Sequence, residues 1–145
     1  MAGGKGSSLR DSVLNAVIGG ASYTPPATVY VALLTGVPNP NGSDLASLEV
    51  SGTSTGYARQ AIPNNDSNWT VSSGGAGSKS NINQISFGTA TNVGGWGTVA
   101  YSAILDSATI GAGNILYYGQ LAASKTIQQY DGFIIPANGI TLTET

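Results

Sequence analysis

The stretch TVYVALLT, residues 28–35, is the strongest strand signal in the chain. Its apolar side chains fall on both alternating faces, so neither face of a strand formed here can be left in water. Strands of this kind lie inside a sheet that is covered on both sides. Pro25 and Pro26 force the preceding backbone to be extended. We therefore expect residues 28–35 to form a central strand.

Downstream of this strand, turn residues divide the chain into short segments. Residues 36–56 are rich in Gly, Pro, Asn and Ser, have one weak apolar stretch at 45–50, and predict a long surface loop. Together with residues 28–35, the strand-like segments that follow predict about nine strands and an all-β fold, an antiparallel β-sandwich of jelly-roll type. These segments are 57–62, 69–72, 79–87, 97–105, 114–121, 125–128, 132–135 and 140–143.

Upstream, the pattern changes twice. Residues 1–7 are small and polar and predict a flexible N-terminal arm, whereas residues 8–19 predict a short helix that ends at Gly19-Gly20. We expect residues 8–145 to form one domain. The helix carries an apolar stripe, which closes one end of the sandwich or docks on a neighbouring subunit. The stripe consists of Leu9, Val13 and Val17.

Composition excludes several classes of function. Only 8% of the 145 residues are charged, the net charge is −2, and there are five Lys and Arg residues, so we expect no nucleic-acid partner and no membrane partner. The chain has no His and no Cys. It therefore lacks the usual general base and the soft metal ligands. We expect no enzyme, no catalytic residues, no cofactor and no metal.

The remaining motifs are weak. Residues 64–68, NNDSN, offer oxygen ligands for calcium but lack the spacing of an EF-hand loop, and they are more typical of a turn. A small glycosidase needs two carboxylates aimed at one bond, and the acids of this chain are scattered without such a pair.

Aromatic residues are more informative than charged ones. Most of the tyrosines and tryptophans suit the core and rim of a sandwich, because they combine an apolar ring with a polar tip. Trp69 and Tyr130 lie in polar segments. They are therefore candidate anchors for a protein partner, where such residues often dominate binding. With the helix stripe, the candidate contact residues are Leu9, Val13, Val17, Trp69 and Tyr130.

The order of several segments resembles a known class of proteins. The helix before Gly19-Gly20, the segment 23–35, and the later segments GYARQ (56–60), WGTV (96–99) and GNILYYGQL (113–121) are similar to those of small virion proteins of tailed bacteriophages. Proteins of this class are structural, either capsid decoration proteins or tail-fibre-like proteins. The resemblance covers the chain from about residue 8 and implies no catalytic motif.

The resemblance implies a structural part of the virion and leaves its location open. The function that we expect is capsid decoration. Such a protein would lie on the capsid surface of the virion after synthesis in the bacterial cytoplasm, and would clamp neighbouring copies of the major capsid protein. Binding only to the assembled shell would stabilise that shell. We also expect a homo-oligomer, a dimer or a trimer. The alternative is a tail-fibre or tail-tip module that binds a host receptor or glycan.

Overall fold

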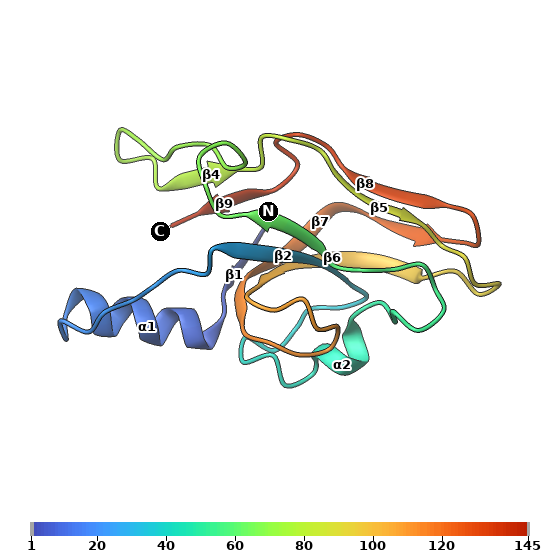
Figure 1. Ribbon diagram of the computed structural model, residues 1–145, viewed down its shortest axis with the longest axis horizontal. Helices are drawn as coiled ribbons and strands as arrows, with labels where there is room; N and C mark the ends of the chain where they lie inside the picture. The colour runs from blue at the N-terminus through green and yellow to red at the C-terminus, as the bar shows by residue number, and fades with distance from the viewer. Residues whose placement is uncertain (1, 145) are drawn as a thin grey trace.

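The computed structural model describes residues 2–144. Its elements are β1 (Ala2–Lys5), α1 (Ser7–Val17), β2 (Thr28–Leu34), α2 (Leu45–Leu48), β3 (Gln60–Pro63), β4 (Ser78–Ser80), β5 (Ile85–Thr89), β6 (Gly97–Leu105), β7 (Ile115–Ile127), β8 (Gly132–Ile135) and β9 (Thr141–Thr143). As the sequence predicts, β2 lies inside the largest sheet. This sheet has five strands in the order β1-β7-β6-β2-β3, and all of its pairs are antiparallel. Two further antiparallel pairs, β4-β9 and β5-β8, lie above it in Figure 1.

The main core lies between the five-stranded sheet and the two strand pairs. Alternate residues of β2 point into it, and Val31 and Leu33 are fully buried there. The strand pairs contribute Phe87 and Phe133, whose rings pack edge to face at 6.0 Å. We call this the strand-pair side of the sheet.

The opposite side of the sheet is covered by loops. Ala32 and Leu34 of β2 pack there with Ala103 and Leu105 of β6 and with Leu45 of α2. Residues 36–56 are therefore not simply the surface loop that composition predicts, because they contain α2 and the fully buried Leu45. We call this the loop side of the sheet.

The observed fold confirms a mainly β structure with antiparallel sheets and one short N-terminal helix, and α2 adds a single turn. A jelly roll in particular is not confirmed, because the strands divide into sheets of five, two and two. Residues 69–72 do not form a strand; Trp69 makes an isolated bridge with Asn81. Residues 114–121 and 125–128, predicted as separate strands, belong to the single strand β7, whose register with β6 shifts between Val99 and Tyr101.

The N-terminal segment differs from the predicted flexible arm. Residues 2–5 form β1 along the edge of β7, and α1 begins at Ser7 rather than Ser8; Met1 lies outside the described residues. Glycine makes this docking feasible, because a Cβ on Gly3 would lie 1.7 Å from the Tyr118 carbonyl oxygen. A Cβ on Gly6 would lie at the same distance, 1.7 Å, from the Ile115 carbonyl oxygen. Composition indicated flexibility here, whereas the close approach of two backbones requires glycine.

Candidate interaction surfaces

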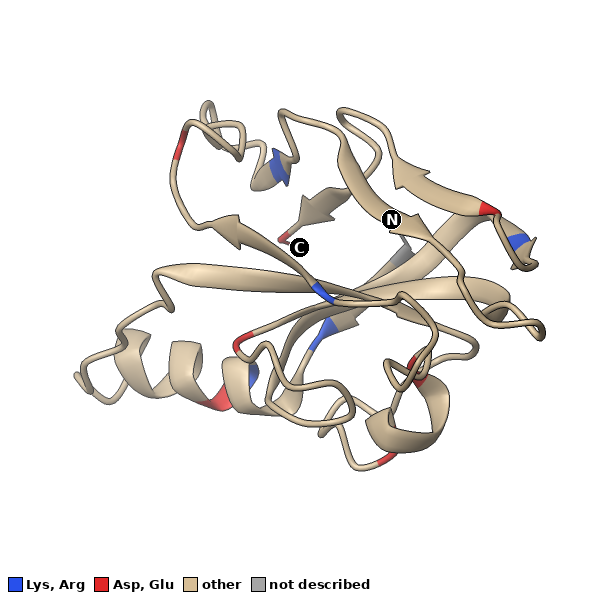
Figure 2. Cartoon of the chain, turned by 45° about the vertical axis from the view of Figure 1, so that its right-hand side comes forward, with Lys and Arg blue, Asp and Glu red and all other residues tan. Residues whose placement is uncertain are grey.

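Charged side chains are sparse and dispersed over the molecule (Figure 2). Within residues 2–144, no group of three or more Asp and Glu residues is close enough to hold a metal ion. No helix in this part of the chain is long and apolar enough to cross a membrane. Because charged residues are few, the candidate surfaces described below consist mainly of apolar or hydrogen-bonding groups.

One pair of charges is buried completely on the loop side of the sheet. Glu49 accepts two hydrogen bonds from Arg59, from Nε at 2.8 Å and from Nη2 at 2.6 Å, and both side chains are at most 1% exposed. The remaining Arg59 nitrogen, Nη1, donates to the carbonyl oxygens of Ser107 and Ala112. The pair ties residues 49–59 to the loop between β6 and β7.

Tyr57 joins this ion pair to the strand-pair side. Its hydroxyl donates to Glu49 at 3.0 Å and accepts the backbone N–H of Leu33, also at 3.0 Å, while its ring packs against Trp96. Burial, and next the negative charge of Glu49, raises the pKa of Tyr57 well above its usual value. Because every group here is enclosed and paired, the cluster supports the fold and is not open to a ligand.

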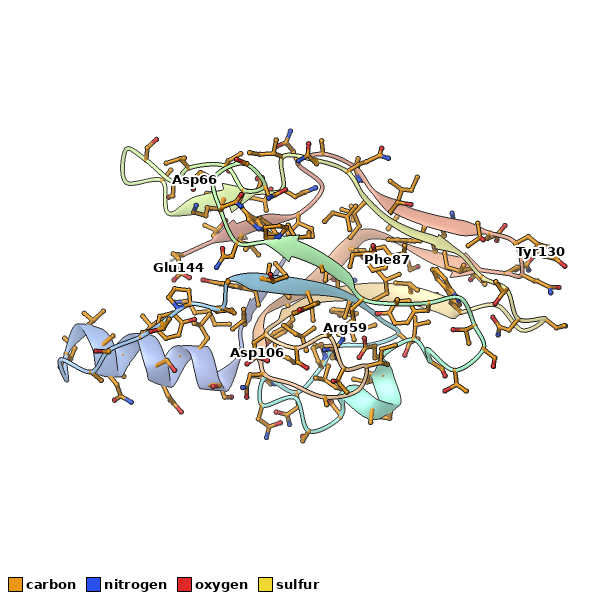
Figure 3. The ribbon with its side chains drawn as sticks, in the orientation of Figure 1. Arg59, Asp66, Phe87, Asp106, Tyr130 and Glu144 are labelled. Atoms are coloured by element: carbon orange, nitrogen blue, oxygen red, sulfur yellow. The ribbon has the colours of Figure 1, made fainter. Side chains whose placement is uncertain are left out.

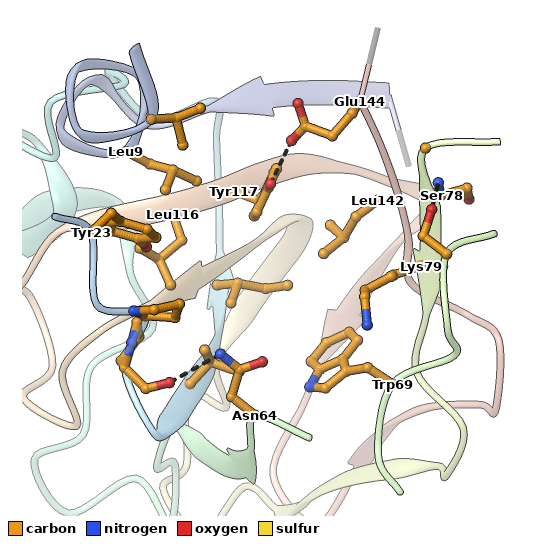
Figure 4. Close-up of a pocket in the computed structure, with 17 residues that line it drawn as sticks. Leu9, Tyr23, Asn64, Trp69, Ser78, Lys79, Leu116, Tyr117, Leu142 and Glu144 are labelled. Carbon is orange, nitrogen blue, oxygen red and sulfur yellow. Dashed lines mark hydrogen bonds between the residues drawn. The ribbon is translucent and has the colours of Figure 1, made fainter. Parts of the chain in front are cut away.

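An open pocket of about 340 Å³ lies beside α1 (Figure 4). Most of its lining is apolar and comes from α1, from residues 23–26 and from the strand-pair side of the sheet. At one wall Tyr117 donates a hydrogen bond to Glu144, which also pairs with Lys5. Burial opposes ionisation of Glu144, but the bonds from Lys5 and Tyr117 outweigh it and hold the pKa of Glu144 below its usual value. The pocket therefore combines an apolar floor with polar side chains on more than one wall, among them Asn64 and Lys79.

Trp69, which the sequence offers as a candidate anchor for a protein partner, lines this pocket. Its side chain is 4% exposed and packs in the main core, and its indole Nε1 has no hydrogen-bond partner within residues 2–144. The polar neighbours of Trp69 in the sequence suggested a loop at the surface. Its ring instead packs among the apolar side chains of the main core.

The apolar stripe of α1 is divided between the core and the surface. Leu9 is buried and Val13 lines the pocket, whereas Val17 is 73% exposed. Leu14 and Ile18 widen the stripe in the sequence, and both are also exposed. We call Leu14, Val17 and Ile18 the apolar ridge of α1.

Tyr130 lies at the end of the molecule opposite α1 (Figure 3). It is 78% exposed, and its φ of 69° is in the left-handed region. The turn is held by a bond from the Tyr130 N–H to the Ala90 carbonyl oxygen at 2.8 Å. The same contact brings Tyr130 close to the loop that carries Val93, which is 88% exposed and was missed from the sequence. We call Tyr130 and Val93 the tip.

A family model described as podophage GP4 fiber I protein gp80 matches residues 5–143, which is nearly the full length. No curated protein matches the chain.

Proposed function

Because the chain belongs to the family of podophage GP4 fiber I protein gp80, we propose that it is a structural subunit of a bacteriophage tail fibre. The match over residues 5–143 carries this proposal. It agrees with the resemblance seen in the sequence and makes the chain a structural protein of the phage virion. Capsid decoration, which we ranked first from the sequence, is not supported, and the fibre alternative fits the match better.

The chemistry of the molecule supports a passive role in the fibre. The few charged groups are dispersed or paired, as with Glu49 and Arg59 in the interior and Lys79 and Asp66 at the surface. We propose that the chain has no catalytic activity, holds no cofactor, and contacts neither nucleic acid nor membrane. Its partners are other virion proteins, including copies of itself.

Two surfaces are suited to such contacts. The apolar ridge of α1 and the tip expose large apolar side chains at opposite ends of the molecule. Exposed apolar and aromatic residues are typical anchors of protein interfaces. A subunit with one contact surface at each end is suited to joining the virion on one side and a further partner, such as a host receptor or glycan, on the other.

Copy number is the first test of this proposal. A fibre subunit should be present in a handful to a few dozen copies per particle, counted by quantitative mass spectrometry against the major capsid protein. Hundreds of copies would place the chain on the shell and overturn the fibre assignment.

Particles prepared without the chain provide the second test. They should retain packaged DNA on heating as the parent particles do, because the shell is unchanged, but they should adsorb poorly to cells. Normal adsorption together with early loss of DNA would instead support the decoration function, since a ligand that binds only the assembled shell stabilises it.

A further inference from the structure

The pocket beside α1 is lined by a buried polar atom that the fold leaves without a partner. Trp69 is 4% exposed, and its indole Nε1 has no hydrogen bond within residues 2–144. The other tryptophan, Trp96, is buried to a similar degree, but its Nε1 donates to the Thr55 carbonyl oxygen at 2.8 Å. Buried polar groups are nearly always paired. An unpaired donor in the lining of a pocket therefore points to a ligand that accepts its bond.

Asn64 supplies a complementary atom in the same lining. In Figure 4 the nitrogen edge of the Trp69 indole faces the side of the pocket on which Asn64 lies. The Asn64 side-chain nitrogen donates to the Pro26 carbonyl oxygen at 3.0 Å, whereas its Oδ1 has no partner in the described part of the chain. A hydroxyl group suits this pair of atoms, because it accepts one hydrogen bond and donates another.

The charged groups of the lining are already paired. Glu144 accepts a bond from Tyr117 and pairs with Lys5. Lys79 pairs with Asp66 at 3.2 Å. A charged ligand would have to replace one of these partners, whereas a neutral ligand leaves them in place. The pocket therefore favours a neutral ligand.

The remainder of the ligand has to be apolar and small. Aliphatic side chains form the floor and offer no partner to a polar group; they include Val29, Ile104, Leu116 and Leu142. A sugar ring would place several hydroxyls against this floor, and each unpaired hydroxyl would weaken binding. The volume of about 340 Å³ is close to the lower limit of about 300 Å³ for small-ligand pockets. Such a volume suits a single ring.

We propose that the pocket receives the phenol ring of a tyrosine side chain from a partner protein. The hydroxyl accepts the bond from Trp69 Nε1 and donates to Asn64 Oδ1, while the ring covers the apolar floor. Among side chains, tyrosine alone joins an aromatic ring to a hydroxyl, and it is enriched at protein interfaces. A single water molecule would satisfy the same two atoms but would leave the floor in contact with water. That the ring belongs to a protein rests on the proposed function, in which the partners are other virion proteins.

The two indole N–H resonances report occupation of the pocket, because the chain has two tryptophans. p-Cresol, which is the free side chain of tyrosine, should be titrated into the isotope-labelled full chain. We expect the Trp69 resonance to move with saturation in the millimolar range, since a single ring has few atoms with which to bind. The Trp96 resonance should stay in place, because its N–H is already bonded to Thr55. Absence of a saturable shift at Trp69 would overturn the proposal.

A series of ligands tests the chemistry of the site. Toluene has the same ring without the hydroxyl and should bind about two- to twelve-fold more weakly than p-cresol, as expected for one hydrogen bond. Methyl glucoside carries several hydroxyls and should show no measurable binding. Equal binding of toluene and p-cresol would indicate a purely apolar pocket, and tighter binding of the glucoside would indicate a sugar site. Either result would overturn the proposal.

N-Acetyl-tyrosinamide tests whether the ring can enter while attached to a backbone. It should bind at least as tightly as p-cresol and should move the same Trp69 resonance. Binding of p-cresol alone would limit the pocket to free phenols and overturn the assignment to a protein side chain. The copy number per particle does not depend on any of these titrations, so failure of this inference is distinguishable from failure of the fibre assignment.

Trp69→Phe supplies the variant that isolates the hydrogen bond. It keeps an aromatic ring in the lining and removes Nε1, so the preference for p-cresol over toluene should be lost, as measured from backbone amide shifts at the pocket. Trp96→Phe is the matched control, because it removes a paired donor outside the pocket and should keep the preference. If a variant fails to fold, the ligand series on the parent chain still decides. A preference that persists in Trp69→Phe would contradict the bond assigned to Nε1.

Discussion

The two sides of the five-stranded sheet are held together by different forces. On the strand-pair side, aromatic and aliphatic side chains such as Phe87, Trp96 and Val99 form a continuous apolar core. On the loop side, a smaller apolar cluster is supplemented by the buried pair of Glu49 and Arg59. The stability of the strand-pair side therefore depends on apolar contact area, and that of the loop side on the completeness of a polar network.

This difference predicts different responses to substitution. Apolar contacts are lost in proportion to the atoms removed and the cavity that remains. A buried charge that loses its partner instead incurs most of its desolvation penalty at once. Substitutions of similar size should therefore cost more within the ion-pair network than in the apolar core.

Glu49→Ala should have the largest effect. It leaves the Arg59 guanidinium buried with only the carbonyl oxygens of Ser107 and Ala112 as partners, and should lower the free energy of unfolding by about 3–5 kcal/mol. Lys79→Ala removes the exposed pair with Asp66 and should cost less than about 1 kcal/mol. Urea denaturation measures both. A double variant, Glu49→Met/Arg59→Met, should be less destabilised than Glu49→Ala; if it is equally unstable, the comparison of the two sides fails.

Tyr57→Phe tests the residue that joins the two sides. The Leu33 N–H and Glu49 both lose a partner, and we expect a loss of about 1–3 kcal/mol. The pKa of Tyr57 is raised by burial first and by Glu49 second, so the folded chain keeps this proton while the unfolded chain releases it near pH 10. Its contribution is thus fully present below about pH 10 and declines as the pH rises further.

The measurement is the urea midpoint between pH 8 and pH 11. Tyr57→Phe should weaken the alkaline decline but not remove it, because burial, and next the bond to Glu144, also raises the pKa of Tyr117. An identical pH dependence in Tyr57→Phe and the parent chain would contradict the role given to this hydroxyl.

Ile104→Val tests the strand-pair side with a conservative change. Ile104 is 3% exposed in the main core, and removal of one methylene group should cost about 0.5–1.5 kcal/mol. Ile134→Val is the control, because Ile134 is 54% exposed on β8. A larger cost for Ile104→Val than for Tyr57→Phe would reverse the order predicted for the two sides.

The smallest effect on folding is expected at the tip. Tyr130→Asn should change the free energy of unfolding by less than about 0.5 kcal/mol, because the side chain is exposed and Asn tolerates the left-handed conformation. If the tip is a contact surface, the same variant should nevertheless reduce adsorption of particles that carry it. Normal adsorption of both Tyr130→Asn and Val93→Ser particles would remove the tip from the proposed contact surfaces.

Local pattern in the sequence was sufficient for the strands that cross the middle of the sheet. Residues 28–35 have apolar side chains on both faces, and β2 is covered on both faces. Turn residues also located β6 and β8 correctly, at 97–105 and 132–135. These features depend on alternation and on turn chemistry, which are properties of a few neighbouring residues.

The candidate contact residues show where this information ends. Trp69 and Tyr130 have equally polar neighbours in the sequence, yet Trp69 is buried and Tyr130 is exposed. The stripe of α1 was recognised from its spacing. Spacing does not say that only the first half of the stripe, Leu9 and Val13, faces the pocket beside β7. Burial of a side chain depends on segments that are distant in the sequence.

By itself the sequence determined that this chain is mainly β, that it has one N-terminal helix, and that few of its residues are charged, because composition and short-range periodicity are sufficient for these conclusions. Tertiary structure alone decided that Glu49 and Arg59 pair, that residues 2–5 form the edge strand β1, and how the strands divide among three sheets. Each of these features joins residues that are distant along the chain. Such pairings are selected by packing of the whole molecule rather than by local preference.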